Sequence, residues 1–298
     1  MSGSTTFLGL PESSAPDVIV LPIPYEGTVS YGGGTARGPG AILAATAFVE
    51  TWDEELGVSL ENLGYRVLPV VDPDDRDADA MTEHIYAAAR NAVADDRFLL
   101  ALGGEHSVTP GVVRAVAERR ENLSVLHIDA HADLRSEYEG SRNSHACACR
   151  RIRDHVSTTV SVGIRAISEP EARLIEEEEI PIYWARDVVG RTDWIPEAVD
   201  RLTDEVYLTV DLDGLDPSIM PATGTPEPGG LGWYETLALI RETARRKRIV
   251  AADLVELAPM PGLHAPDFLA ARLAAKIVAY VFGGREDRTM MRGRTEKP

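Results

Sequence analysis

The chain has 298 residues, of which 44% are hydrophobic and 26% charged, an ordinary composition for a folded globular protein. Its formal net charge of −18 argues against binding to nucleic acid, because a phosphate backbone binds a basic surface. No apolar run reaches the ~18 residues of a membrane span, and the N-terminus lacks the basic and apolar regions of a signal peptide. We therefore expect a soluble, cytoplasmic protein that does not contact a membrane.

The positive charge of the chain is carried almost entirely by arginine, since Lys247, Lys276 and Lys297 are its only lysines. An acidic, lysine-poor surface is what we expect of a protein adapted to high salt, where the self-repulsion of the chain is screened. The same acidity favours cationic ligands.

Short apolar segments alternate with helical patterns along the chain. The expected strands cover residues 17–21, 66–71, 97–102, 123–128, 159–164, 181–184, 206–212 and 249–255. The expected helices cover residues 38–50, 80–95, 109–120, 169–178, 194–203, 234–247 and 267–281. Several strands are apolar on both faces, which is typical of a parallel sheet covered on both sides. The pattern predicts one α/β domain over residues 1–298, with three α/β/α layers and a mostly parallel sheet of about eight strands.

Histidine and carboxylate side chains follow four of the expected strands. They are His106 after 97–102; Asp129, His131 and Asp133 after 123–128; Asp211, Asp213 and Asp216 at the end of 206–212 and just beyond it; and Glu256 after 249–255. Ligands of such sheets bind beyond the carboxyl ends of the strands, so we expect these groups to meet at one edge. Imidazole and oxygen donors without thiolate favour a pair of divalent cations, manganese before iron, cobalt or zinc. Such a pair can lower the pKa of a shared water towards neutrality.

These motifs resemble those of the ureohydrolases, the family of arginase and agmatinase. The resemblance lies in GGEHS (103–107), DAHAD (129–133), DLDGLDP…TGTPEPGG (211–230) and DLVELAP (253–259), in the family's order and spacing. It implies the arginase-like fold, two Mn²⁺ ions per subunit, and hydrolysis of a guanidinium group to urea and an amine. It also implies a homo-oligomer, a trimer or a hexamer.

The resemblance assigns the metal ligands residue by residue. One manganese ion would be held by His106, Asp129, Asp133 and Asp211. The second would be held by His131, Asp129, Asp211 and Asp213, with Asp129 and Asp211 bridging the two ions. His127 lies on the same strand face but matches no ligand position of the family, so we predict that it supports the site or the core and does not bind metal.

Three catalytic roles follow from the same resemblance. Glu256 would receive the guanidinium group, which pairs well with a carboxylate. His145, in NSHA, would be the proton shuttle, and Asp133 would hydrogen-bond the attacking hydroxide. The chain has Ala146 and Ala222 where the family often has glycine, and these departures matter only if the positions need a positive φ.

The loop at residues 134–144 resembles that of the agmatinase branch, particularly its archaeal-type members. Arg135 and Glu137 in this loop are predicted to contact the substrate. We expect the substrate to be agmatine or an aminopropyl-agmatine, a small cationic guanidine, with putrescine or spermidine as the product of polyamine biosynthesis. Guanidino acids such as guanidinobutyrate, and arginine, stay open because Arg135 or Arg142 could pair with a substrate carboxylate.

Two other classes of function also stay open. A metal-binding homologue without turnover would keep the ligands but release no urea, and a deacetylase of the related fold would bind a single zinc. Cys147 and Cys149 are predicted to be reduced thiols, because they are too close in sequence for an easy disulfide and too few for a zinc site. The glycine-rich segment 31–40 lacks the Gly-Lys-Ser/Thr ending of a P-loop and is expected to form a pocket rim.

Overall fold

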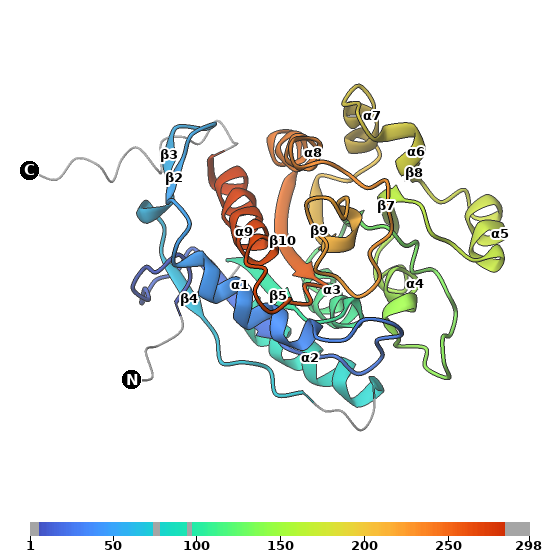
Figure 1. Cartoon of the computed structure of the whole chain (residues 1–298), viewed down its shortest axis with the longest axis horizontal. Coiled ribbons are helices and arrows are strands. Elements are labelled where there is room, and N and C mark those ends of the chain that lie inside the picture. Colours follow the sequence, from blue (N-terminus) through green and yellow to red (C-terminus); the bar gives the residue numbers. More distant parts are fainter. Residues whose placement is uncertain (1–5, 74–77, 94–96, 284–298) are drawn as a thin grey trace, which may run out of the picture.

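The computed structural model describes residues 6–73, 78–93 and 97–283, and its centre is an eight-stranded sheet (Figure 1). The strand order is β4-β1-β5-β10-β9-β6-β7-β8, and the described strands of this sheet pair in parallel. The strands are β1 (Val18–Ile23), β4 (Tyr65–Val67), β5 (Phe98–Gly103), β6 (Leu123–Ile128), β7 (Thr158–Ile164), β8 (Ile182–Trp184), β9 (Glu205–Asp211) and β10 (Arg248–Val255).

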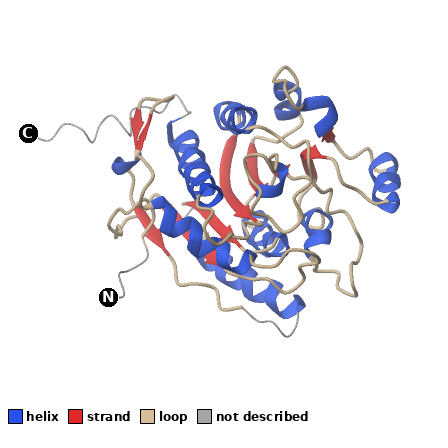
Figure 2. Ribbon diagram, viewed as in Figure 1, coloured by secondary structure: helices blue, strands red, loops and turns tan. Residues whose placement is uncertain are grey.

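Helices cover both faces of the sheet (Figure 2). They are α1 (Gly38–Thr46), α2 (Ala78–Ala92), α3 (Thr109–Ala117), α4 (Ala148–Ile152), α5 (Glu169–Glu177), α6 (Ala185–Val188), α7 (Ile195–Asp200), α8 (Trp233–Arg246) and α9 (Ala265–Gly283). One apolar core lies between the sheet and α1, α7, α8 and α9, and a second lies between the sheet and α2 and α3.

Alternate residues of β1 show how each strand contributes side chains to both cores. Val18 and Val20 belong to the core under α1, α8 and α9, whereas Ile19 and Leu21 belong to the core under α2 and α3. Successive side chains of a strand point to opposite faces, so a strand buried on both faces must be apolar throughout. The predicted three-layer α/β/α fold with an eight-stranded sheet is confirmed, and the sheet is parallel throughout its described strands.

The structure differs from the prediction in its shortest elements. A hairpin of β2 (Trp52–Asp53) and β3 (Val58–Ser59) and the helices α4 and α6 were not expected. Segments of two to five residues are too short to show a period, so only their tertiary contacts reveal them. The expected strand 66–71 ends at Val67, just before Leu68-Pro69, because proline cannot donate to the ladder.

The described helices include none that is long and apolar enough to cross a membrane.

Candidate active site

The predicted metal ligands and Glu256 lie at the carboxyl ends of four neighbouring strands, β5, β10, β9 and β6. His106 begins the turn after β5, Asp129 follows β6, and Asp211 ends β9. All the predicted ligands are buried except His131, which is partly exposed. The parallel sheet therefore gathers donors that are far apart in the sequence.

His106 points its Nδ1 atom at three carboxylates. This nitrogen lies 3.0 Å from Asp129 Oδ2, 3.1 Å from Asp211 Oδ2 and 3.3 Å from Asp133 Oδ2. Its other ring nitrogen lies 3.0 Å from Thr209 Oγ1. Nδ1 is buried and has no hydrogen-bond partner of acceptable geometry among the described residues. A buried nitrogen left without a partner among three carboxylates fits a metal ligand, and these four residues are the predicted first set.

His131 forms the second cluster on the other side of Asp129. Its Nδ1 atom lies 3.0 Å from Asp213 Oδ2 and 3.6 Å from Asp129 Oδ1. Asp129 thus faces His106 with one oxygen and His131 with the other, and it belongs to both groups that could hold an ion. Asp211 lies against His106, and its Oδ1 accepts a hydrogen bond from the Asp213 amide at 2.8 Å, so its contact with a second ion stays a prediction.

The buried carboxylates of the site lie close together and repel one another, so they need positive charge nearby. Burial, and then the charges of Asp213 and Asp129, raise the pKa of Asp211 well above its usual range. Burial, and then Glu105 and Asp213, do the same to the pKa of Glu256. Divalent cations would relieve this repulsion, and an imidazole and carboxylate donor set suits manganese.

His127 is fully buried, and its ring contacts the carboxylate of Asp129. Its Nε2 lies 2.7 Å from Asp129 Oδ2, and its Nδ1 lies 3.0 Å from Ser161 Oγ. Together with His106, Asp129 and Asp133 it forms one of the two groups whose ligand atoms could hold an ion, a group that does not include Asp211. Because both ring nitrogens already have partners, the geometry supports the prediction that His127 orients Asp129.

Glu256 lies directly beside the metal cluster. Its Oε1 accepts a hydrogen bond from the His106 amide at 2.7 Å, which ties the end of β10 to the turn after β5. Its backbone φ is 68°, and that of Asp133 is 52°. The left-handed region is uncommon for such residues and costs free energy, so the surrounding structure must hold both carboxylates in place.

His145 is positioned by residues that the sequence did not indicate. Its amide donates to Thr28 Oγ1 at 2.9 Å, and its Nδ1 lies 3.3 Å from the same oxygen. Thr28 Oγ1 in turn donates to Glu105 Oε1 at 2.6 Å, and the Thr28 amide donates to Glu105 Oε2 at 2.8 Å. Glu105 is fully buried and also accepts from the Ser107 hydroxyl. Glu105 stands next to His106 in GGEHS, but nothing in the sequence pointed to Thr28.

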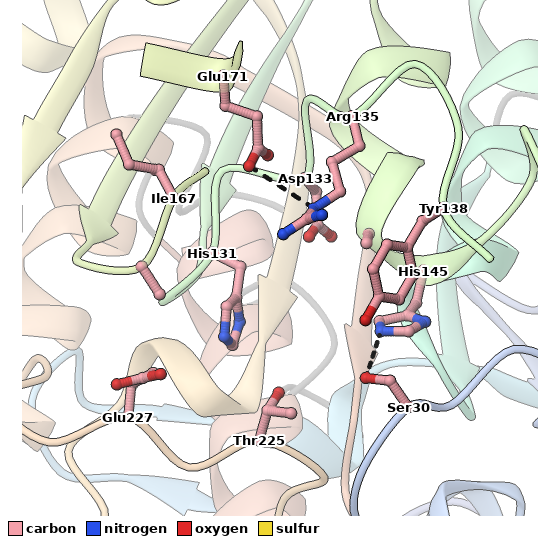
Figure 3. Close-up of a pocket in the computed structure, with 12 residues that line it drawn as sticks. Ser30, His131, Asp133, Arg135, Tyr138, His145, Ile167, Glu171, Thr225 and Glu227 are labelled. Atoms are coloured by element: carbon pink, nitrogen blue, oxygen red, sulfur yellow. Dashed lines mark hydrogen bonds and ion pairs between the residues drawn. The ribbon is translucent and has the colours of Figure 1, made fainter. Parts of the chain in front are cut away.

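A pocket of about 230 Å³ opens over His131 and Asp133 (Figure 3). Its lining residues are Ser30, His131, Asp133, Arg135, Tyr138, His145, Ala146, Ala166, Ile167, Glu171, Thr225 and Glu227. The predicted shuttle His145 and the predicted substrate contact Arg135 therefore share one cavity with two of the predicted metal ligands, whereas Glu256 is not among its lining residues. Ser30, just before the glycine-rich segment, contributes to the rim.

Arg135 and Glu137 have different places in the loop after β6. Arg135 Nε lies 3.8 Å from Glu171 Oε2, and its guanidinium stacks over the Tyr138 ring at 4.7 Å from the centroid. Glu137 is exposed and is not among the residues that line the pocket. The geometry thus supports a substrate contact for Arg135 and gives no support to one for Glu137.

The comparison with known proteins agrees with this geometry. The sequence model of the arginase family matches residues 16–283 of this chain.

The chain belongs to the arginase family.

Several arginase-family proteins match it over nearly their whole length. The N(1)-aminopropylagmatine ureohydrolase of Synechocystis is 44% identical over 270 residues, which cover 88% of this chain and 88% of that protein. The enzyme of the same name from Thermus thermophilus is 37% identical and covers 89% of each. The crystal structure of the agmatine ureohydrolase of Thermoplasma volcanium superimposes with a TM-score of 0.86 at 28% identity, covering 95% of this chain and 96% of that one. The predicted resemblance to the agmatinase branch of the family is confirmed.

The two alanines that replace family glycines fit the backbone of this chain. Neither Ala146 nor Ala222 has a positive φ, so neither position requires glycine for its conformation. Cys147 and Cys149 are buried free thiols, as predicted.

Proposed function

We propose that this protein is a binuclear manganese ureohydrolase that cleaves agmatine or N1-aminopropylagmatine to urea and the corresponding amine, putrescine or spermidine. The observation that carries the proposal is Asp129 shared between two His/Asp clusters, with the Glu256 carboxylate beside them. A family protein with this arrangement has every group that the hydrolysis of a guanidinium needs. We also propose a trimer or hexamer in the cytoplasm.

The two ions, held by the His106 and His131 clusters, would supply a water of lowered pKa and positive charge near the reacting carbon. Glu256 binds the guanidinium and holds it over the clusters. Asp133, on the pocket floor, accepts a hydrogen bond from the attacking water. His145, on the pocket wall, carries a proton to the leaving amine, and Thr28 holds its ring.

The charges around the pocket favour an amine over a carboxylate on the substrate. Arg135 makes an ion pair with Glu171, which balances its charge, whereas the Glu227 carboxylate lines the same pocket without an ion pair among the described residues. Arg142 is exposed and lines a different pocket. These positions argue against guanidinobutyrate and arginine, the alternatives that the sequence left open.

The substrate proposal is tested by measuring urea release from Mn²⁺-loaded protein. Agmatine, N1-aminopropylagmatine, guanidinobutyrate and arginine are compared in dilute buffer and in high KCl. We expect turnover of the first two. Turnover of arginine alone would contradict the substrate class, a metal-loaded protein without urea release would indicate a non-catalytic homologue, and acetate release from acetylated amines would indicate a deacetylase.

Thr28→Val is expected to lower kcat about tenfold, because it removes the hydroxyl that positions His145. Thr28→Ser keeps that hydroxyl and should restore most of the rate. The manganese content of both variants should equal that of the wild type. The dependence of kcat on pH shows whether Thr28 acts through His145. A Val variant with an unchanged profile and rate would show that Thr28 does not position the shuttle.

The net charge of −18 predicts that salt stabilises the fold. Screening the self-repulsion of the chain outweighs the loss of surface ion pairs, which contribute little each. The thermal midpoint should rise by about 5 °C or more between dilute buffer and molar KCl. A midpoint indifferent to KCl would contradict adaptation to high salt.

A further inference from the structure

Outside the predicted metal clusters, the pocket has two carboxylates, those of Glu171 and Glu227. Only the carboxylate of Glu171 makes hydrogen bonds with the described residues. Glu171 Oε1 accepts the Leu134 amide at 2.9 Å, and its Oε2 accepts the Ser168 amide at 2.8 Å and the Ser168 hydroxyl at 2.6 Å. Arg135 adds an ion pair. Glu171 therefore stabilises the start of α5, and its oxygens have little hydrogen-bonding capacity left for a ligand.

Glu227 differs, because its carboxylate makes no hydrogen bond or ion pair with any residue that the structure describes. Its backbone carbonyl, by contrast, accepts hydrogen bonds from Arg165 Nε at 3.2 Å and Nη2 at 2.7 Å. Nη1 and Nη2 of Arg165 also donate to backbone carbonyls of β7 and of the segment 213–215. Arg165 thus anchors the backbone of Glu227 and interacts with its half-buried carboxylate only through charge at longer range, without an ion pair, so the carboxylate can still bind a ligand in the pocket.

Glu227 lies in a segment, residues 224–227, that runs from Glu256, the predicted guanidinium-binding residue, to the pocket. A Cβ built on Gly224 would lie 3.7 Å from Glu256 Oε2, so the segment begins beside Glu256. Thr225 Oγ1 then donates to Asp213 Oδ2 at 3.3 Å, and Thr225 and Glu227 both line the pocket. In Figure 3 Glu227 lies across the pocket from Glu171 and Arg135.

The backbone around Glu227 is stiff. Pro226 and Pro228 flank it and restrict the φ angles on either side. Farther back, the Gly32 amide donates to the Gly224 carbonyl at 3.1 Å, so the glycine-rich loop holds the start of the segment. When Glu227 binds a cation, its side chain therefore has to be ordered but its backbone does not.

We propose that Glu227 is a specificity-determining residue, which binds the ammonium or secondary amine at the far end of the substrate while Glu256 binds its guanidinium. The inference rests on the proposed function and extends it: the pocket recognises two positive charges, one at each end of the segment 224–227. A guanidine without a second cationic nitrogen would leave Glu227 without its partner.

The test compares Glu227→Gln, which removes the charge and keeps the size, with Glu176→Gln on the exposed side of α5 as the control. The substrates are N1-aminopropylagmatine, agmatine and butylguanidine, which has the four carbons of agmatine but no amine. Glu227→Gln should raise KM about 10- to 100-fold for the two amines, the range for a charged hydrogen bond, and leave butylguanidine and kcat unchanged. The control should match the wild type.

An equal loss with butylguanidine, or no change with the amines, would overturn the role of Glu227. A second measurement does not depend on turnover: calorimetric titration of the Mn²⁺-loaded proteins with spermidine, a product amine without a guanidinium. Spermidine should bind the wild type at least about tenfold more tightly than Glu227→Gln. Equal affinities would refute the inference, whereas a wild type that releases no urea from any guanidine would refute the proposed function alone.

Discussion

Asp129→Asn is expected to lower kcat/KM for agmatine about 1,000-fold or more and to reduce the manganese bound per chain. Asp129 is fully buried, faces His106 with Oδ2 at 3.0 Å, and faces His131 with Oδ1 at 3.6 Å. Asparagine keeps the size of the side chain but removes the charge from the point where the two clusters meet. Urea release and metal content measured on the same sample check the prediction.

The Asp129 variant should still fold, because asparagine keeps the size of the side chain and its oxygen can still accept the hydrogen bond of the His131 amide. An Asp204→Asn variant, at an exposed position before β9, provides the control and should behave as the wild type. Near-normal turnover of Asp129→Asn would contradict a centre in which both ions share this carboxylate.

Glu256→Gln is expected to lower kcat/KM for agmatine about 100- to 1,000-fold while leaving the manganese content unchanged. In the proposed complex the carboxylate would pair with the planar guanidinium through charge-assisted hydrogen bonds, which a neutral amide cannot reproduce. The glutamine carbonyl can still accept the His106 amide, so the link between β10 and the turn after β5 survives. Steady-state kinetics and metal analysis together check it.

The two variants therefore have different signatures. Asp129→Asn should lose metal and activity together, whereas Glu256→Gln should lose activity alone. A loss of manganese from Glu256→Gln would mean that this residue supports the metal centre and does not bind the substrate.

The sequence was sufficient for the parts of the structure that are periodic or that follow a strand directly. Strand β6 has the predicted bounds, 123–128, because most of its residues on both faces are apolar and its end is marked by DAHAD. His106 and Asp211 could be placed beside Asp129 because parallel strands deliver their carboxyl ends to one edge. No geometry beyond the parallel sheet is needed for these assignments.

Other features depended on contacts that no local pattern encodes. Thr28 reaches Glu105 and His145 across 77 and 117 residues of sequence, through a hydroxyl that many surface threonines also have. The availability of Glu227 depends on where the donors of Arg165 are directed. Glu137 was expected to contact the substrate because the loop at 134–144 resembles that of the agmatinase branch. Its side chain is exposed and does not line the pocket, and the loop turns at Tyr138, whose backbone pairs with Ser141.

The most direct test of the account is a titration of the metal-free protein with Mn²⁺ in which bound metal and urea release from agmatine are measured together. A binuclear centre predicts saturation at two ions per chain, with urea release appearing as the second ion binds. Saturation at one ion, or two bound ions without urea from agmatine, N1-aminopropylagmatine, guanidinobutyrate or arginine, would contradict it.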